Sequence, residues 1–126
     1  MKKRISKIIF LPILFFLFFN FPVNAEEWSK KDYFFESVFL SLHAIDYFQT
    51  IKLSKNQNKY KEMNIFLGDS PSQEKINLFF LGTSLLHIGI VHIMPQKYRI
   101  YFQTSSIVIT AAIVGHNYGI GLKFGF

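Results

Sequence analysis

Two long stretches without a charged residue constrain this chain more than any other feature. One covers the 21 positions 76–96 and the other the 23 positions 100–122. A helix needs about 20 predominantly apolar residues to cross a bilayer, and both stretches reach that length. Pro95, near the end of the first stretch, ends the helix that this stretch predicts. The pattern therefore predicts an antiparallel pair of transmembrane helices, because a helix satisfies its own backbone hydrogen bonds within lipid.

A third helix is predicted before this pair. Ser29 and Asp32 form a variant of the capping box, in which Asp32 stands where Glu or Gln is usual. Residues 33–53 contain no Gly or Pro, and most of their polar members gather on one narrow stripe of a largely apolar surface. The stripe consists of Glu36, His43, Asp46 and Thr50.

A further helix start is predicted at Ser70, with Pro71 as the first helical residue and Gln73 closing the box. We therefore expect an all-α fold, a small transmembrane bundle of three helices at 29–53, 70–94 and 98–118, within one membrane domain spanning residues 26–126. The competing interpretation is a soluble helical domain, because both uncharged stretches contain several polar residues. Against it, about 100 residues bury only a modest core, so such apolar helices would expose large patches to water.

The N-terminus has the three parts of a secretory signal peptide. Residues 1–7 are basic, residues 8–21 are almost wholly apolar, and residues 23–25 place small side chains before Glu26. We expect residues 1–25 to be removed as a signal peptide, and the alternative is an uncleaved anchor helix. In both cases Glu26 lies outside the cytoplasm, because the positive flank stays inside.

Composition excludes several classes of protein. The net charge is +6, but from Glu26 onward ten Lys and Arg residues stand against eight Asp and Glu residues. The excess therefore comes mostly from the N-terminal region, and we expect no nucleic-acid partner. The absence of cysteine excludes a disulfide scaffold, a thiol nucleophile and a cysteine-ligated metal.

The basic residues also indicate an orientation. With Glu26 in the periplasm, the loop at 52–75 is cytoplasmic and the turn at 95–99 is periplasmic. This arrangement places six basic residues inside (Lys52, Lys55, Lys59, Lys61, Lys75 and Lys123) and four outside (Lys30, Lys31, Lys97 and Arg99). The bias agrees with the positive-inside rule, so we expect the bacterial inner membrane with a periplasmic mature N-terminus.

The C-terminus suggests a different location. Residues 118–126 alternate in polarity and end in Phe126, as the last strand of a bacterial outer-membrane barrel does. Such a barrel needs at least eight strands of about ten residues, and the mature chain does not contain eight alternating segments. Association with the outer membrane therefore remains the minority alternative.

Asp46 is the most conspicuous candidate for a functional side chain. A carboxylate within a membrane-spanning segment normally faces a partner or a water-filled cavity. Candidate partners are His43, His87, His92 and His116. Such contacts suit a structural hydrogen-bonded clasp or a proton relay. His43, Asp46, His87 and His116 are also weak candidates for the ligands of a metal ion.

The last uncharged stretch also has a polar stripe, which consists of Gln103, Ser106, Thr110 and Asn117. We expect it to pack against Thr83, Ser84 and His87 of the preceding helix, with Gly82 and Gly89 allowing a neighbouring helix to approach closely. The serines lack a G-x-S-x-G setting, and no HExxH motif or phosphate-binding glycine loop is present. No catalytic residue or cofactor is therefore assigned.

Several spaced motifs resemble a family of small, uncharacterised bacterial and prophage-associated helical membrane proteins. They are Asp46-x2-Gln49-Thr50, Glu62-x-Asn64-x2-Leu67-Gly68-x2-Pro71-Ser72, His87, Pro95-x3-Arg99-x3-Gln103 and Asn117-x3-Gly121. Family members usually have Pro after the central Asn, where this chain has Ile65. The resemblance implies a helical membrane protein, assigns no reaction, and suggests that Asp46, Gln49, Thr50, Glu62 and Asn64 meet in one polar cluster.

Two hypotheses for function follow. The first is a small non-enzymatic integral membrane protein that acts through helix–helix contacts, for example as a subunit or modulator of a larger complex. Its partners would be the lipid bilayer and another protein or a second copy. The second is a membrane-embedded proton-handling, ion-handling or metal-dependent protein centred on Asp46, Glu62 and the histidines. In both, the polar intramembrane cluster comprises Asp46, Gln49, Thr50, Glu62, Asn64, His87 and Asn117.

Overall fold

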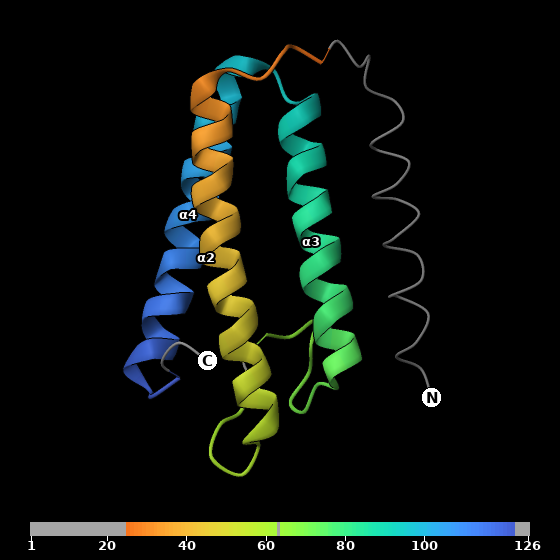
Figure 1. The fold of residues 1–126 in the computed structure, drawn as a ribbon, viewed down its shortest axis with the longest axis vertical. Helices are drawn as coiled ribbons and strands as arrows, with labels where there is room; N and C mark the ends of the chain where they lie inside the picture. Colours follow the sequence, from red (N-terminus) through yellow and green to blue (C-terminus); the bar gives the residue numbers. More distant parts are fainter. Residues whose placement is uncertain (1–24, 63, 123–126) are drawn as a thin grey trace.

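The computed structural model describes residues 25–62 and 64–122, which form three long helices (Figure 1). These are α2 (Lys30–Lys55), α3 (Gln73–Ile93) and α4 (Gln96–Gly119). No strand forms within these two ranges, so the expected all-helical fold is confirmed for them. Nearly all of the expected signal peptide and the last four residues of the alternating C-terminus lie outside the described residues. Tyr118 and Gly119, where that alternation begins, belong to α4.

The predicted capping box at the start of α2 is confirmed. The Ser29 hydroxyl accepts a hydrogen bond from the Asp32 backbone N–H at 3.2 Å, and the Asp32 carboxylate accepts one from the Ser29 backbone N–H at 2.8 Å. The helix continues two residues beyond the expected end at residue 53. Lys52 and Lys55 lie in its last turn, where positive charge stabilises the exposed carbonyl groups.

The predicted start of α3 was wrong by two residues. Ser72 is the N-cap, and its hydroxyl accepts a hydrogen bond from the Lys75 backbone N–H at 3.2 Å. Ser70 and Pro71 precede the helix, and the side chain of Pro71 is buried. Two serines two residues apart can each begin a helix, so spacing alone did not separate them.

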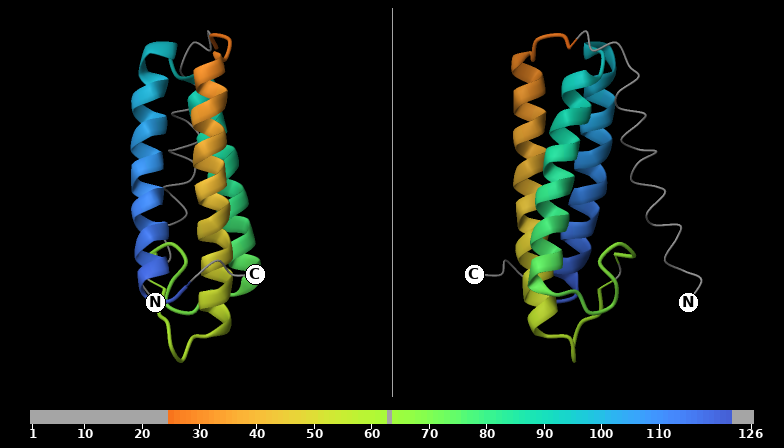
Figure 2. Two further views of the ribbon diagram at one scale, coloured as in Figure 1. Left: turned by 60° about the vertical axis from the view of Figure 1, so that its left-hand side comes forward. Right: turned by 90° about the vertical axis from the view of Figure 1, so that its right-hand side faces the viewer.

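The three helices run side by side, with α2 and α4 parallel and α3 antiparallel to both (Figures 1 and 2). α2 makes most of its contacts with α4 and fewer with α3, whereas α3 and α4 touch only briefly. The expected antiparallel order of α3 and α4 is therefore present, but their packing on each other is not. Both helices are held by α2, which supplies the polar partners of α4.

The bundle buries many polar side chains and exposes many apolar ones. Within residues 25–62 and 64–122, eight polar or charged residues are buried, namely Asp32, Glu36, Gln49, Thr50, His87, Arg99, Gln103 and Thr110. Large apolar residues are exposed along the helices, including Phe34, Leu78, Leu81, Leu85, Val108, Ile109 and Ile113. A soluble protein usually hides its apolar side chains and exposes its charges, so this bundle does the reverse over much of its length.

Among the described helices, α3 alone is long and apolar enough to cross a membrane by length and composition. α2 has charged residues at both ends and in its interior, such as Asp32, Glu36 and Asp46. α4 is almost uncharged, but its Gln, Ser, Thr, Asn and Tyr residues lower its hydropathy. Composition thus supports one candidate span in the described chain, where the sequence pattern predicted three.

The two serines before α3 give a matched test of the fold. We expect Ser72→Ala to lower the free energy of unfolding by about 1 kcal/mol, because it removes the N-cap hydrogen bond. Ser70→Ala should leave it unchanged, because Ser70 lies outside the helix. Denaturation of both variants, followed by circular dichroism, measures the difference, and equal losses would contradict the helix start at Gln73.

Candidate functional site

Most of the buried polar side chains, together with the half-buried Asp46 and Asn117, form two clusters at opposite ends of the bundle. The charged cluster lies near the turn between α3 and α4 and comprises Asp32, Glu36, His87, Arg99 and Gln103. The amide cluster lies near the loop that joins α2 to α3 and comprises Asp46, Gln49, Thr50 and Asn117. Both clusters join α2 to α4, and only the charged cluster also includes a residue of α3.

Arg99 is the centre of the charged cluster and is fully buried. Its Nη1 atom lies 3.1 Å from the Asp32 carboxylate and donates to the Glu27 backbone carbonyl. Its Nη2 atom donates to the Glu26 carbonyl at 2.6 Å, and its Nε atom donates to the Met94 carbonyl at 2.9 Å. A guanidinium offers five N–H donors in a fixed fork, which suits one side chain that must join several segments.

The sequence interpretation placed Arg99 at the end of the periplasmic turn at 95–99 and assigned it no partner. α4 begins at Gln96, two residues earlier than predicted, so Arg99 belongs to the first turn of that helix. Its charge is paired within the bundle with the Asp32 carboxylate at 3.1 Å.

Glu36 and His87 form a second pair one helical turn deeper. The His87 Nδ1 atom lies 2.8 Å from Glu36 Oε1, and Gln103 Nε2 donates to Glu36 Oε2 at 3.0 Å. The same Gln103 nitrogen donates to the Asp32 carbonyl at 3.0 Å. The Glu36 carboxylate is thus held by side chains from both α3 and α4.

The His87 ring is stacked between two phenyl rings. Its centroid lies 3.7 Å from that of Phe39 in α2 and 4.8 Å from that of Phe102 in α4. The Nε2 atom of His87 and the Oε1 atom of Gln103 are buried and have no hydrogen-bond partner among the described residues. The stack fixes the imidazole where the three helices meet.

Sequence reasoning missed most of this cluster, although a signal was present. Asp32 and Glu36 are four residues apart on α2, and Arg99 and Gln103 are four residues apart on α4. Since residues four apart share one helix face, two facing pairs of this kind can bond in parallel. Both contacts join residues separated by 67 positions, as expected for parallel helices in one register.

The amide cluster holds the other ends of α2 and α4 together. Asn117 Nδ2 donates to Asp46 Oδ1 at 3.3 Å and to Gln49 Oε1 at 3.2 Å. Gln49 Nε2 donates to the Val114 carbonyl at 3.2 Å and to the Leu122 carbonyl at 3.0 Å. Thr50 is buried one helical turn after Asp46 on the same face of α2. The geometry is that of a hydrogen-bonded clasp.

The loop residues named from the sequence lie beside this clasp. Glu62 Oε1 accepts the Asn64 backbone N–H at 2.8 Å, and Asn64 Oδ1 accepts the Phe66 backbone N–H at 3.0 Å. The Asn64 carbonyl accepts the N–H groups of Leu67 and Gly68 at 3.1 Å. Asn64 therefore organises this turn. The turn forms although this chain has Ile65 after Asn64, where members of the family that it resembles usually have Pro.

A cavity of about 490 Å³ lies between the loop, α2 and α4, with Phe80 of α3 contributing to its wall. Asp46, Thr50, Glu62, Asn64 and Asn117 all line it, so five of the seven predicted cluster residues share one space. Gln49 lies next to it through its bond with Asn117. His87 does not belong to this group, because it pairs with Glu36 in the charged cluster.

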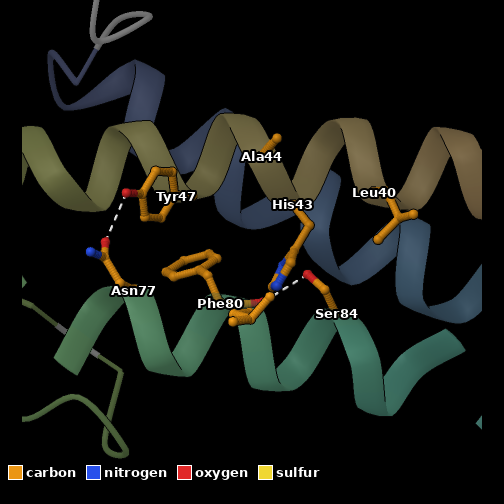
Figure 3. A pocket seen from close by; sticks show the side chains of 8 residues that line it. Leu40, His43, Ala44, Tyr47, Asn77, Phe80 and Ser84 are labelled. Atoms are coloured by element: carbon orange, nitrogen blue, oxygen red, sulfur yellow. Dashed lines mark hydrogen bonds between the residues drawn. The ribbon is translucent and has the colours of Figure 1, made fainter. Parts of the chain in front are cut away.

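The histidines proposed as partners of Asp46 are dispersed. His43 bonds the Thr83 hydroxyl at 2.9 Å and points towards α3 beside Phe80 (Figure 3). His116 lines the cavity with Asp46, whereas His92 is exposed near the opposite end. In the described part of the chain, no three His, Asp or Glu residues lie together as a metal site would require.

The polar stripe of α4 faces α2 more than the predicted partners on α3. Gln103 and Asn117 both bond to α2, and His43 of α2 bonds Thr83 of α3. Gly82 and Gly89 border open space, since an added Cβ at either would meet nothing within 4 Å of the described chain. The expected close helix approach at these glycines does not occur within this bundle.

Comparison with known proteins adds no further assignment. The chain matches no protein-family model, and no curated protein or solved structure is significantly similar to it.

The buried Arg99 gives a direct test of the charged cluster. We expect Arg99→Met to lower the free energy of unfolding by about 3–5 kcal/mol, because it leaves the buried Asp32 carboxylate without its ionic partner. Lys97→Met, two residues earlier and exposed, is the control and should change it by less than about 0.5 kcal/mol. Urea denaturation in one detergent compares the three proteins, and an unaffected Arg99→Met variant would contradict the ion pair.

Proposed function

We propose that this protein is a small non-enzymatic integral membrane protein of the bacterial inner membrane, which acts through contacts between helices as a subunit or modulator of a larger assembly. α2, α3 and α4 each cross the bilayer in this proposal, and the turn between α3 and α4 lies in the periplasm. The resemblance noted above has the same implication for location.

The observation that carries the proposal is the inverted distribution of polarity. Arg99, Asp32, Glu36 and Gln103 are buried and joined by hydrogen bonds, whereas Leu, Ile and Val are the large residues most often exposed in the middle of α3 and α4. In water this surface would be an aggregation hazard, while in lipid it is already solvated. Charged side chains within a membrane usually face the bundle interior and pair, as these do, or face a water-filled cavity.

The proposed mode of action rests on the outer face of α3. Leu78, Leu81 and Leu85 are exposed on that helix, and α4 covers little of it. Gly82 and Gly89 leave open space beside these leucines. Small residues at such a face let the backbone of another membrane helix approach closely, so a partner helix would fit there.

The chain contains no cysteine, so single cysteines introduced by mutation can be labelled to test its topology. We expect the protein in the inner-membrane fraction after alkaline carbonate washing. Lys97→Cys should react with a membrane-impermeant maleimide in intact spheroplasts, because Lys97 follows the periplasmic turn. Lys59→Cys should react only after lysis, because it lies in the loop at the opposite end of the bundle.

Equal labelling of both positions in intact spheroplasts would contradict the proposed topology. Recovery of the protein in the soluble fraction would contradict membrane residence. Labelling of both variants after detergent treatment is the control for reactivity.

The partner surface can be tested by photo-crosslinking in intact membranes. A photoreactive residue in place of Leu85 should give one discrete protein adduct, because Leu85 lies on the uncovered face of α3. The same residue in place of Lys59 is the control and should not give that adduct. Only lipid adducts at Leu85 would contradict an action through helix contacts.

A further inference from the structure

A cavity of about 490 Å³ lies beside the amide cluster. Its wall combines two carboxylates, Asp46 and Glu62, with an apolar side formed by Leu53, Leu67, Phe80 and Ile113. We propose that it is a binding site for a primary ammonium group carried on an aliphatic chain, in which the two carboxylates bind the ammonium and the apolar side holds the chain.

The charge of the cavity is the first argument. Each carboxylate of the charged cluster has a nitrogen partner within the bundle, since Asp32 pairs with Arg99 and Glu36 pairs with His87. Asp46 and Glu62 have no ion-pair partner among the described residues. A positive charge placed beside two neighbouring carboxylates favours their ionised forms, so this pair suits a positively charged ligand.

The lysine that lines the cavity does not pair with the two carboxylates. Lys61 lines it, but its Nζ atom lies 3.6 Å from the Asp69 carboxylate, and both side chains are mostly exposed. The charge of Lys61 is thus directed towards Asp69 on the surface of the loop.

Hydrogen bonding indicates which cation fits. Glu62 Oε1 accepts the Asn64 N–H, whereas Glu62 Oε2 accepts no hydrogen bond from the described residues. Asp46 Oδ1 accepts only a long bond of 3.3 Å from Asn117. Ionised carboxylate oxygens form their strongest bonds with charged N–H donors, which a primary ammonium supplies and a quaternary ammonium lacks.

The other wall of the cavity argues against competing ligands. Quaternary ammonium groups are recognised by cages of aromatic rings, but Phe80 is the one phenyl, tyrosyl or indole ring among the described lining residues. A divalent cation would need more carboxylate or histidine ligands than the described residues bring together here. It would also make no favourable contact with the apolar side of the cavity. The volume of about 490 Å³ suits a small organic molecule.

Two sources could supply this chemistry, a membrane lipid with an amino-terminated aliphatic chain and a free alkyl amine. The lipid source rests on the proposed membrane residence, whereas binding of a free amine does not. If the protein were found in the soluble fraction yet bound the amine, the proposed function would fail and the site would stand.

The test is calorimetric titration of n-hexylammonium into the full-length protein in a neutral detergent, with titration into micelles alone subtracted. We expect saturable binding of one ligand per chain. Glu62→Gln and Ala112→Phe should weaken it at least about tenfold, because one removes a carboxylate acceptor and the other fills the cavity. Hexyltrimethylammonium should bind the unaltered protein at least about tenfold more weakly than n-hexylammonium.

Matched variants separate the site from non-specific effects. Glu74→Gln removes the same charge from the exposed first turn of α3, and Ala111→Phe places the same ring beside the cavity but outside its lining. Both should bind n-hexylammonium within about twofold of the unaltered protein. Absence of saturable binding, or equal losses in the cavity and control variants, would overturn the proposal, as would equal affinity for the two ammonium ions.

Native mass spectrometry of protein extracted from membranes then identifies the source. A retained lipid with an amino-terminated aliphatic chain that is lost in Glu62→Gln supports the membrane source. Intact binding of n-hexylammonium without retained lipid supports a free amine.

Discussion

The burial of Arg99 is the constraint on which the rest of this bundle depends. A guanidinium does not lose its charge in proteins, so a fully buried one must find an acceptor for its N–H groups. Asp32 and the carbonyls of the chain before α2 and after α3 provide these acceptors. One side chain thereby fixes three segments at one end of the bundle. Because it pairs α2 with α4 in parallel, it also sets the register in which Glu36 meets Gln103.

The same register has consequences along the whole length of the helices. α2 and α4 are joined again at the far end by Asn117, Asp46 and Gln49. A small apolar core of Leu67, Ile76 and Phe80 packs α3 and the loop against α2 at that same end. α3 is held by fewer contacts, chiefly His87 with Glu36, His43 with Thr83 and Tyr47 with Asn77 (Figure 3). The outward faces remain apolar. A bundle with its charges paired inside and its aliphatic residues outside is suited to lipid and to contact with other membrane helices.

Local features of this fold could be predicted from sequence, and pairings between distant segments could not. The three helices followed from their hydrophobic and uncharged stretches, and the Ser29–Asp32 capping box followed from spacing. Asp46, Gln49 and Asn117 were expected among intramembrane polar residues and do meet. The pairing of Arg99 with Asp32 was missed because α3 and α4, as neighbours in sequence, were expected to pack on each other. Which neighbouring helix a polar stripe faces depends on how the helices are arranged in space. The sequence pattern of one helix carries no information about that arrangement.

The central claim is that the outer faces of α3 and α4 contact lipid while the charges lie within. Spin labels attached through single cysteines at Leu85 and Val108, in protein reconstituted into lipid vesicles, test it most directly. Electron paramagnetic resonance should find both labels strongly relaxed by oxygen, which partitions into lipid, and protected from a water-soluble nickel complex. A label at Lys59 should show the opposite preference. Nickel accessibility at Leu85 and Val108 as high as at Lys59 would contradict the account, because those faces would then contact water.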